Sequence, residues 1–247
     1  CMTLEVYGAV DGRMQLLTPV PISGGEFNSI GAAPQIRLGA RFDTGRRFSK
    51  VNLHAAYEHD VLTGFAGNEP TLAGDGYPYK PGLTQQPRQL FGRAALGRYA
   101  QLSVGLMTSH WGLGLLANDG AHGWHLGSAR FADPRGGDRV FRALLSTGPH
   151  SRSKLVAAFG ADILHDDDAM LDGDSGYQFF GVLALGQNQK RSAGVYIVRR
   201  HQEAADGSAS DIWVIDATGQ GRWRIGGLTL ALAAEVAVIT GTTELAP

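Results

Sequence analysis

The stretch QIRLGARFDTGRRFSKVNLHAAYEHD (residues 35–60) decides the fold, because its side chains alternate between two chemical classes. Before the TGRR turn, Ile36 and Leu38 stand at even-numbered positions, whereas Arg37 and Arg41 stand at odd-numbered positions, so the two classes differ in parity. A period of two predicts β-strand, since successive side chains of a strand point to opposite faces. The stretch is therefore predicted to be a β-hairpin with one apolar and one polar face. After the turn the apolar parity holds Val51, Leu53 and Tyr57, and the polar parity holds Lys50, Asn52, His54 and Glu58.

The same alternation recurs along the chain, and no helical period of 3.6 persists. We predict strands at residues 2–17, 35–43, 48–60, 88–97, 100–109, 139–147, 154–164, 177–186, 193–201, 211–218 and 222–240. Between them, short links at 44–47, 97–100, 148–153, 187–192 and 219–222 alternate with longer links at 18–34, 61–87, 110–138, 165–176 and 202–210.

This alternation of link lengths indicates the fold class. In an antiparallel meander, alternate links lie at opposite ends of the strands, so one end carries tight turns and the other carries loops. Transmembrane β-barrels have this asymmetry. We predict an all-β fold, an antiparallel up-and-down meander of about 10–12 strands that forms part of a transmembrane β-barrel.

Composition agrees with a β-rich protein and excludes several other classes. The chain has 247 residues, including 35 glycines, and its net charge of −1 gives no electrostatic basis for a nucleic-acid partner. No uncharged apolar run reaches the roughly 18 residues of a membrane-spanning helix, whereas a spanning strand needs only about 9–11. The single cysteine, Cys1, excludes a disulfide framework or a cysteine-based metal site within the chain.

The apolar faces are predicted to meet lipid, because a charge there costs about 2–4 kcal/mol at the bilayer midplane. Parity is mixed in 139–147 and 193–201, where Arg142 or Arg199 would face lipid in some registers. A soluble secreted β-sandwich also alternates apolar and polar positions and remains an alternative. Aromatic residues near strand ends favour the membrane, since they suit interfacial girdles. These residues are Tyr57, Tyr99, Trp111, Tyr177, Trp213 and Trp223.

The polar faces are predicted to line a water-filled or plugged lumen, and their side chains are the candidate functional residues. A ladder of basic side chains there would favour anions. An internal salt-bridge network that stiffens the wall explains the same residues equally well. By parity the predicted pore lining comprises Arg37, Arg41, Lys50, Asn52, His54, Glu58, Arg93 and Glu235.

The segment SHWGLGLLANDG (109–120) leaves one predicted strand and opens a long link. Ser109 and His110 are adjacent in an extended chain and point to opposite faces, so they cannot form a nucleophile–base pair, and we expect no enzyme. Gly112 and Gly114 allow tight passage of the backbone. We expect the link to fold inward as a constriction or plug. Its candidate residues are Trp111, Asp119, His122 and Trp124.

The acidic link HDDDAMLDGDSG (165–176) is the candidate metal site. Asp166, Asp168, Asp172 and Asp174 offer hard oxygen ligands of the kind that Ca²⁺ takes. Their spacing does not match an EF-hand, and a solvated acidic loop is the competing interpretation. No other cofactor is expected.

We treat residues 1–247 as a single β-barrel domain that is incomplete at both ends. The chain starts at Cys1 without an initiator methionine or a signal peptide, although an N-terminal cysteine is also where a processed lipoprotein begins. Eleven predicted strands is an odd number, whereas bacterial single-chain barrels have even counts. We therefore expect further strands after Pro247, since lipid does not tolerate open sheet edges.

The layout resembles Gram-negative outer-membrane porins and alginate-export-like channels. More narrowly, IRLGARFDTGRRFSKVNLHAAYEHDVLTG (36–64) and GLMTSHWGLGLLANDG (105–120) are similar to a family of large uncharacterised barrels from myxobacteria and their relatives. The resemblance covers residues 35 to 240 and implies a bacterial outer-membrane location. It brings no substrate and no catalytic residues.

We therefore expect a porin-like channel that passes small hydrophilic solutes passively and is surrounded by outer-membrane lipid and lipopolysaccharide. The second hypothesis is a plugged structural or adhesive barrel that presents its long loops outside the cell.

Overall fold

The computed structural model describes residues 2–17, 29–45, 51–67, 82–97, 99–117, 139–147, 154–166, 174–188 and 191–244. None of these residues forms a helix that is long and apolar enough to cross a membrane. They form eleven strands: β1 (Thr3–Leu17), β2 (Ser29–Asp43), β3 (Val51–Gly67), β4 (Gly82–Leu96), β5 (Ala100–Thr108), β6 (Arg139–Thr147), β7 (Leu155–Asp166), β8 (Ser175–Asn188), β9 (Arg191–Glu203), β10 (Ala209–Ile225) and β11 (Leu228–Thr243).

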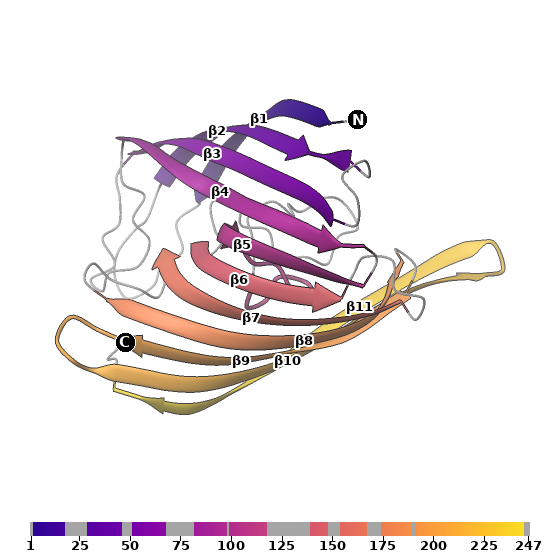
Figure 1. Ribbon diagram of the computed structural model, residues 1–247. Helices are drawn as coiled ribbons and strands as arrows, with labels where there is room; N and C mark the ends of the chain where they lie inside the picture. The colour runs from indigo at the N-terminus through magenta and orange to yellow at the C-terminus, as the bar shows by residue number, and fades with distance from the viewer. Residues whose placement is uncertain are drawn as a thin grey trace.

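All eleven strands belong to one antiparallel sheet whose spatial order is the chain order, β1 to β11. Figure 1 shows this sheet as a curved, open trough with β1 along one margin and β11 along the other. The predicted all-β meander is therefore confirmed. Two stacked sheets, which a sandwich requires, are not present in the part of the chain that the structure describes. Links at one end of the strands are each longer than the links before and after them, as predicted.

Strand boundaries differ from the prediction in two places. β2, β3 and β4 extend well beyond the predicted ranges, into stretches such as SIGAAP (29–34) that lack apolar alternation but still pair with their neighbours. The predicted turn at 219–222 is wrong, because Gly219 and Gly221 stay extended and pair with β11. The chain reverses instead at Gly226 and Gly227, whose φ angles of 56° and 87° suit a two-residue hairpin turn that requires positive φ at both positions.

The distribution of buried side chains is the reverse of that in a soluble protein. Among the described residues, 35 large hydrophobic side chains are exposed, whereas only 9 hydrophobic side chains are buried. The buried set also contains 13 polar or charged side chains, more than the hydrophobic ones. Soluble monomers rarely expose a continuous apolar surface of this extent. The convex face of the sheet is therefore apolar, and most of the polar side chains lie on the concave face.

The two arginines of uncertain parity lie on opposite faces. Arg142 on β6 points into the concave face and is buried beside Asp162. Arg199 on β9 lies on the convex face, with 54 % of its side chain exposed, and pairs with Asp211 near one end of the strands. The outward side chains between Arg199 and Arg191, at the other end of β9, are Ala193, Val195 and Ile197.

Candidate functional site: the concave face of the sheet

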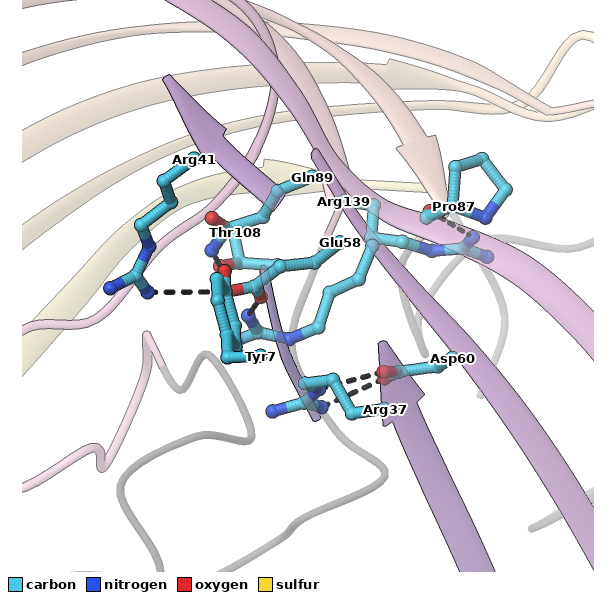
Figure 2. A network of polar contacts seen from close by, with 10 residues as sticks. Tyr7, Arg37, Arg41, Glu58, Asp60, Pro87, Gln89, Thr108 and Arg139 are labelled. Atoms are coloured by element: carbon cyan, nitrogen blue, oxygen red, sulfur yellow. Dashed lines mark hydrogen bonds and ion pairs between the residues drawn. The ribbon is translucent and has the colours of Figure 1, made fainter. Parts of the chain in front are cut away.

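Glu58 on β3 is the centre of a buried polar cluster on the concave face (Figure 2). Its Oε1 accepts a hydrogen bond of 2.6 Å from the Tyr7 hydroxyl on β1, and its Oε2 accepts one of 2.5 Å from the Arg88 guanidinium on β4. Arg41 on β2 stacks over the Tyr7 ring at 4.4 Å and approaches Glu58 Oε1 at 3.5 Å. Arg88 reaches on to Thr108 at 3.4 Å, so the cluster ties β1 through β5 together.

Asp60, two residues further along β3, forms a second contact in the same view (Figure 2). It accepts two parallel hydrogen bonds from Arg37, Nε to Oδ1 at 2.6 Å and Nη2 to Oδ2 at 2.7 Å. Paired bonds of this kind are the strongest arrangement for an arginine and a carboxylate. Arg139, also buried, donates to the Pro87 carbonyl at 3.2 Å.

Arg88 was not among the predicted lining residues, and a β-bulge explains why. Glu58 pairs with Gln89 and His59 pairs with Pro87, so Arg88 is an extra residue on β4. A bulge of this kind shifts the parity of the strand that contains it. Counting back from Leu90, which faces outward, would place Arg88 on the apolar face. Its side chain is instead buried against Glu58.

Most of the predicted lining residues do lie on the concave face. Arg37 and Glu58 both form ion pairs. At these two positions the structure therefore favours a salt-bridge network that stiffens the sheet. Arg41 keeps 48 % of its side chain exposed, and Arg93 on β4 donates to the Ser103 hydroxyl at 3.0 Å without a carboxylate partner among the described residues. Lys50 lies outside the described residues. The others are Asn52, which shares a hydrogen bond with Thr44, His54, which lies 3.6 Å from Asp43, and Glu235.

A further buried ion pair, missed by the sequence analysis, lies on β6 and β7. Arg142 donates to both oxygens of Asp162 at 2.7 Å and to the Ser109 hydroxyl at 2.5 Å. Gln178 on β8 donates to Asp162 at 2.7 Å, and the Arg142 guanidinium lies 4.4 Å from the centre of the Phe180 ring. Both charges are thus fully engaged inside the wall.

The segment Trp111–Ala117, which follows β5, turns into the trough and docks on the opposite wall. It closes on itself through hydrogen bonds from the Trp111 amide to the Ala117 carbonyl at 3.0 Å and from the Gly114 amide to the Trp111 carbonyl at 2.9 Å. The Trp111 ring stacks on Tyr196 of β9 at 5.7 Å, and the Leu113 amide donates to Glu235 Oε2 on β11. Trp111 is therefore not a girdle residue, because it packs inside the trough on an apolar cluster of Phe180, Tyr196 and Val198.

The inward course of this segment agrees with the predicted direction of the link. Of the four residues predicted for a constriction or plug, only Trp111 lies within the described part of the chain. Asp119, His122 and Trp124 lie outside it.

Two carboxyl groups beneath this segment have no cationic partner. Asp216 on β10 has no exposed surface (0 %), and neither of its side-chain oxygens has a hydrogen-bond partner in the described structure. Glu235 on the neighbouring β11 uses Oε2 for the Leu113 amide, while its buried Oε1 is also without a partner. Glu235 is one of the predicted lining residues, whereas Asp216 is not.

The structure does not assemble the predicted metal site. Asp174 accepts hydrogen bonds from Gln202 at 3.2 Å and from the Ala205 amide at 3.3 Å, which tie it to the β9–β10 turn. The side chain of Asp166 and all of Asp168 and Asp172 lie outside the described residues. Within the described ranges, no group of three or more histidine, cysteine, aspartate or glutamate side chains is placed to hold a metal.

The convex face carries aromatic residues and arginines toward both ends of its strands. Arg199 lies over the Trp213 ring at 5.8 Å at one end, and Arg191 lies over the Trp223 ring at 5.6 Å at the other. Of the other predicted girdle residues, Tyr57 and Tyr177 are exposed on the convex face, and Tyr99 is exposed at the turn between β4 and β5.

Comparison with models of known protein families and with curated protein sequences found no match to this chain.

Proposed function

We propose that this chain forms the wall of an outer-membrane β-barrel that passes small hydrophilic solutes through its interior. The observation that carries the proposal is the reversed polarity of the sheet, with 35 large hydrophobic side chains exposed and 13 polar or charged side chains buried among the described residues. A sheet with an apolar outer face and a polar inner face suits hydrocarbon outside and water inside.

The spacing of the two tryptophan–arginine pairs supports a membrane. Trp213 and Trp223 are ten positions apart on β10, which corresponds to about 33 Å along a strand at about 3.3 Å per residue. With the roughly 40° tilt usual in barrels, this spans about 25 Å, the height of the apolar band of outer-membrane barrels. The outward residues between them are Ile215, Ala217, Gly219 and Gly221, none of which is charged. Tryptophan and arginine at the two limits suit the boundary between hydrocarbon and head groups.

The interior supports a narrowed passage. The segment Trp111–Ala117 reaches from β5 to β9 and β11, so it crosses the trough and reduces its cross-section. Arg41 and Arg93 keep guanidinium groups on the opposite wall; Arg41 has only a long contact of 3.5 Å with Glu58, and Arg93 donates to a hydroxyl group. Basic side chains at a constriction favour anionic solutes.

The same segment also favours the second candidate, a plugged structural or adhesive barrel. Bilayer conductance separates the two. We expect the natural full-length protein that contains these residues, extracted in detergent, to insert into planar bilayers and give discrete single-channel steps. Stable insertion without any steps would replace the channel by a sealed barrel. A protein that purifies without detergent and does not insert would refute both.

The membrane assignment has its own test in variants that retain one tryptophan each. In vesicles of brominated phospholipid, Trp213 and Trp223 should be quenched, and more strongly by bromine near the head groups than by bromine at the bilayer centre. Trp111 is the matched control and should not be quenched, because it packs on Tyr196 inside the trough. If Trp213 and Trp223 fluoresce as in unbrominated vesicles, lipid does not cover the convex face.

A further inference from the structure

Asp216 and Glu235 form a pair of acidic side chains on the concave face of β10 and β11. Glu235 lies directly opposite Thr218, and Asp216 precedes Thr218 by two residues, so the three side chains share one face. Asp216 is completely buried and adjoins the side chains of Glu235 and Trp111, yet neither its two oxygens nor Glu235 Oε1 has a hydrogen-bond partner of good geometry in the described structure. A buried carboxylate without a donor or a counter-charge is costly.

Every other buried carboxylate of the described residues has an arginine. Glu58 is paired with Arg88, Asp60 with Arg37, and Asp162 with Arg142. By contrast, neither Asp216 nor Glu235 forms an ion pair with any described side chain. Among the described residues, the β10–β11 wall therefore offers no positive charge to the buried Asp216 and the half-buried Glu235.

The segment Trp111–Leu113 covers this pair from the side of the trough. Gly112 has a φ of 56°, and a Cβ atom there would collide with Glu235 Oε2 and approach the Thr218 hydroxyl oxygen. The Leu113 amide donates to the same Glu235 oxygen, and the neighbouring Trp111 ring stacks on Tyr196. The segment therefore lies directly against Glu235 and Thr218 on the inner face of β10 and β11.

The chemistry of these donors fits a hard divalent cation. Two carboxylates and a hydroxyl are oxygen ligands of the type that Ca²⁺ takes, with water completing the shell. A double positive charge would neutralise the two carboxylates at once. We propose that Asp216 and Glu235, assisted by the Thr218 hydroxyl, hold a Ca²⁺ ion beneath Trp111. The ion fastens the segment Trp111–Ala117 to the β10–β11 wall. This inference does not depend on the membrane or on conductance.

Terbium, which replaces Ca²⁺ and emits when a tryptophan close by is excited, gives a direct readout. The full-length protein in detergent, freed of metal by chelation, should show tryptophan-sensitised Tb³⁺ emission that Ca²⁺ displaces. Asp216→Asn and Glu235→Gln should each weaken Tb³⁺ binding by about tenfold or more, since each removes a charged ligand. Trp111→Phe should abolish the emission yet keep the Ca²⁺-induced rise in thermal stability.

Two controls keep the result specific. Asp206→Asn makes the same change at an exposed turn carboxylate that accepts from Ser208, and it should leave the emission unchanged. Asp168→Asn with Asp172→Asn tests the acidic link and should also leave the emission unchanged. The proposal is wrong if the wild-type protein shows no Ca²⁺-displaceable emission, as it would if the two acids merely shared a proton. It is equally wrong if the Asp216→Asn, Glu235→Gln double variant, still folded by circular dichroism, binds Tb³⁺ as the wild type does.

Discussion

The two inner walls of the trough solve the burial of charge in different ways. On the wall formed by β2 to β7, three buried carboxylates are each held by an arginine of a neighbouring strand. On the wall formed by β10 and β11, the buried Asp216 and the half-buried Glu235 have no arginine among the described residues, and a segment that arrives from β5 covers them. The buried carboxylates of the first wall are therefore neutralised within that wall, whereas those of the second depend on groups from elsewhere.

This difference assigns different roles to the two walls. A network such as Tyr7–Glu58–Arg88 crosses several strands and stiffens the sheet without any external component. The β10–β11 wall is an attachment site, because Glu235 Oε2 accepts a hydrogen bond from the Leu113 amide while Tyr196 on the adjacent β9 stacks on Trp111. Substitutions in the first wall should therefore act mainly on stability, and those in the second mainly on the position of the segment.

The largest effect is expected where the first wall is broken at its most buried pair. Arg142→Met removes the only cation among the described residues that contacts Asp162, and it should lower the free energy of unfolding by about 3–5 kcal/mol, because an unpaired buried carboxylate remains. Denaturant unfolding in lipid vesicles measures this change. The double variant Arg142→Met, Asp162→Leu should recover much of the loss, since no charge is then left in the wall. A single variant as stable as the wild type would contradict the account of a self-contained wall.

The same aspartate-to-asparagine change should have opposite signs on the two walls. Asp162→Asn removes the negative charge that neutralises Arg142 and should destabilise the folded protein by about 1–3 kcal/mol. In the presence of a chelator, Asp216→Asn should stabilise by about 1 kcal/mol, because it removes an unpaired buried charge. With Ca²⁺ in excess, the Asp216→Asn variant should lose the stabilisation that the wild type gains from the ion. Equal destabilisation by both variants in chelator would remove the distinction between the walls.

The sequence predicted the two faces of the sheet but not the contacts between its walls. Alternation is a local property, so the outward Leu38 and Leu53 and the inward Arg37 and Glu58 follow from parity alone. Arg88 was not predicted because a β-bulge reverses the inward–outward alternation of β4 at this position. The bulge can be recognised only from the pairing of β4 with β3. Trp111 was assigned both to a girdle, because it follows a strand, and to the inward link. The contacts that decide between the two, such as that of Leu113 with Glu235, join residues 122 positions apart.

A substitution that detaches the segment Trp111–Ala117 should disturb only its contacts with β9 to β11 and should leave the ion pairs of the first wall intact. Gly112→Ala adds a Cβ atom against Glu235 and places alanine at a φ of 56°, which costs about 1–2 kcal/mol in backbone strain before any displacement. If the protein is a channel, single-channel conductance should rise as the segment leaves the trough. Gly207→Ala is the matched control, since Gly207 also has a positive φ of 86° but nothing within contact distance of its added Cβ. An equal stability loss without a conductance change in both variants would mean that Gly112 contributes only backbone strain.

The smallest effect on stability is expected at the exposed margin of the first wall. Arg41 keeps about half of its side chain exposed, and its contact with Glu58 is long at 3.5 Å, so Arg41→Met should cost less than about 1 kcal/mol. Its stack on Tyr7 is retained in part by the methionine side chain. If the protein is a channel, the charge of Arg41 should affect solutes more than folding, because Arg41 lies on the opposite wall from the segment Trp111–Ala117. In bilayers under a salt gradient, the reversal potential of the Arg41→Met variant should shift toward cation preference, whereas that of Asp206→Asn, at the exposed β9–β10 turn, should stay near the wild-type value. An unchanged reversal potential in Arg41→Met would place the ion pathway away from this wall and leave Arg41 with a structural role only.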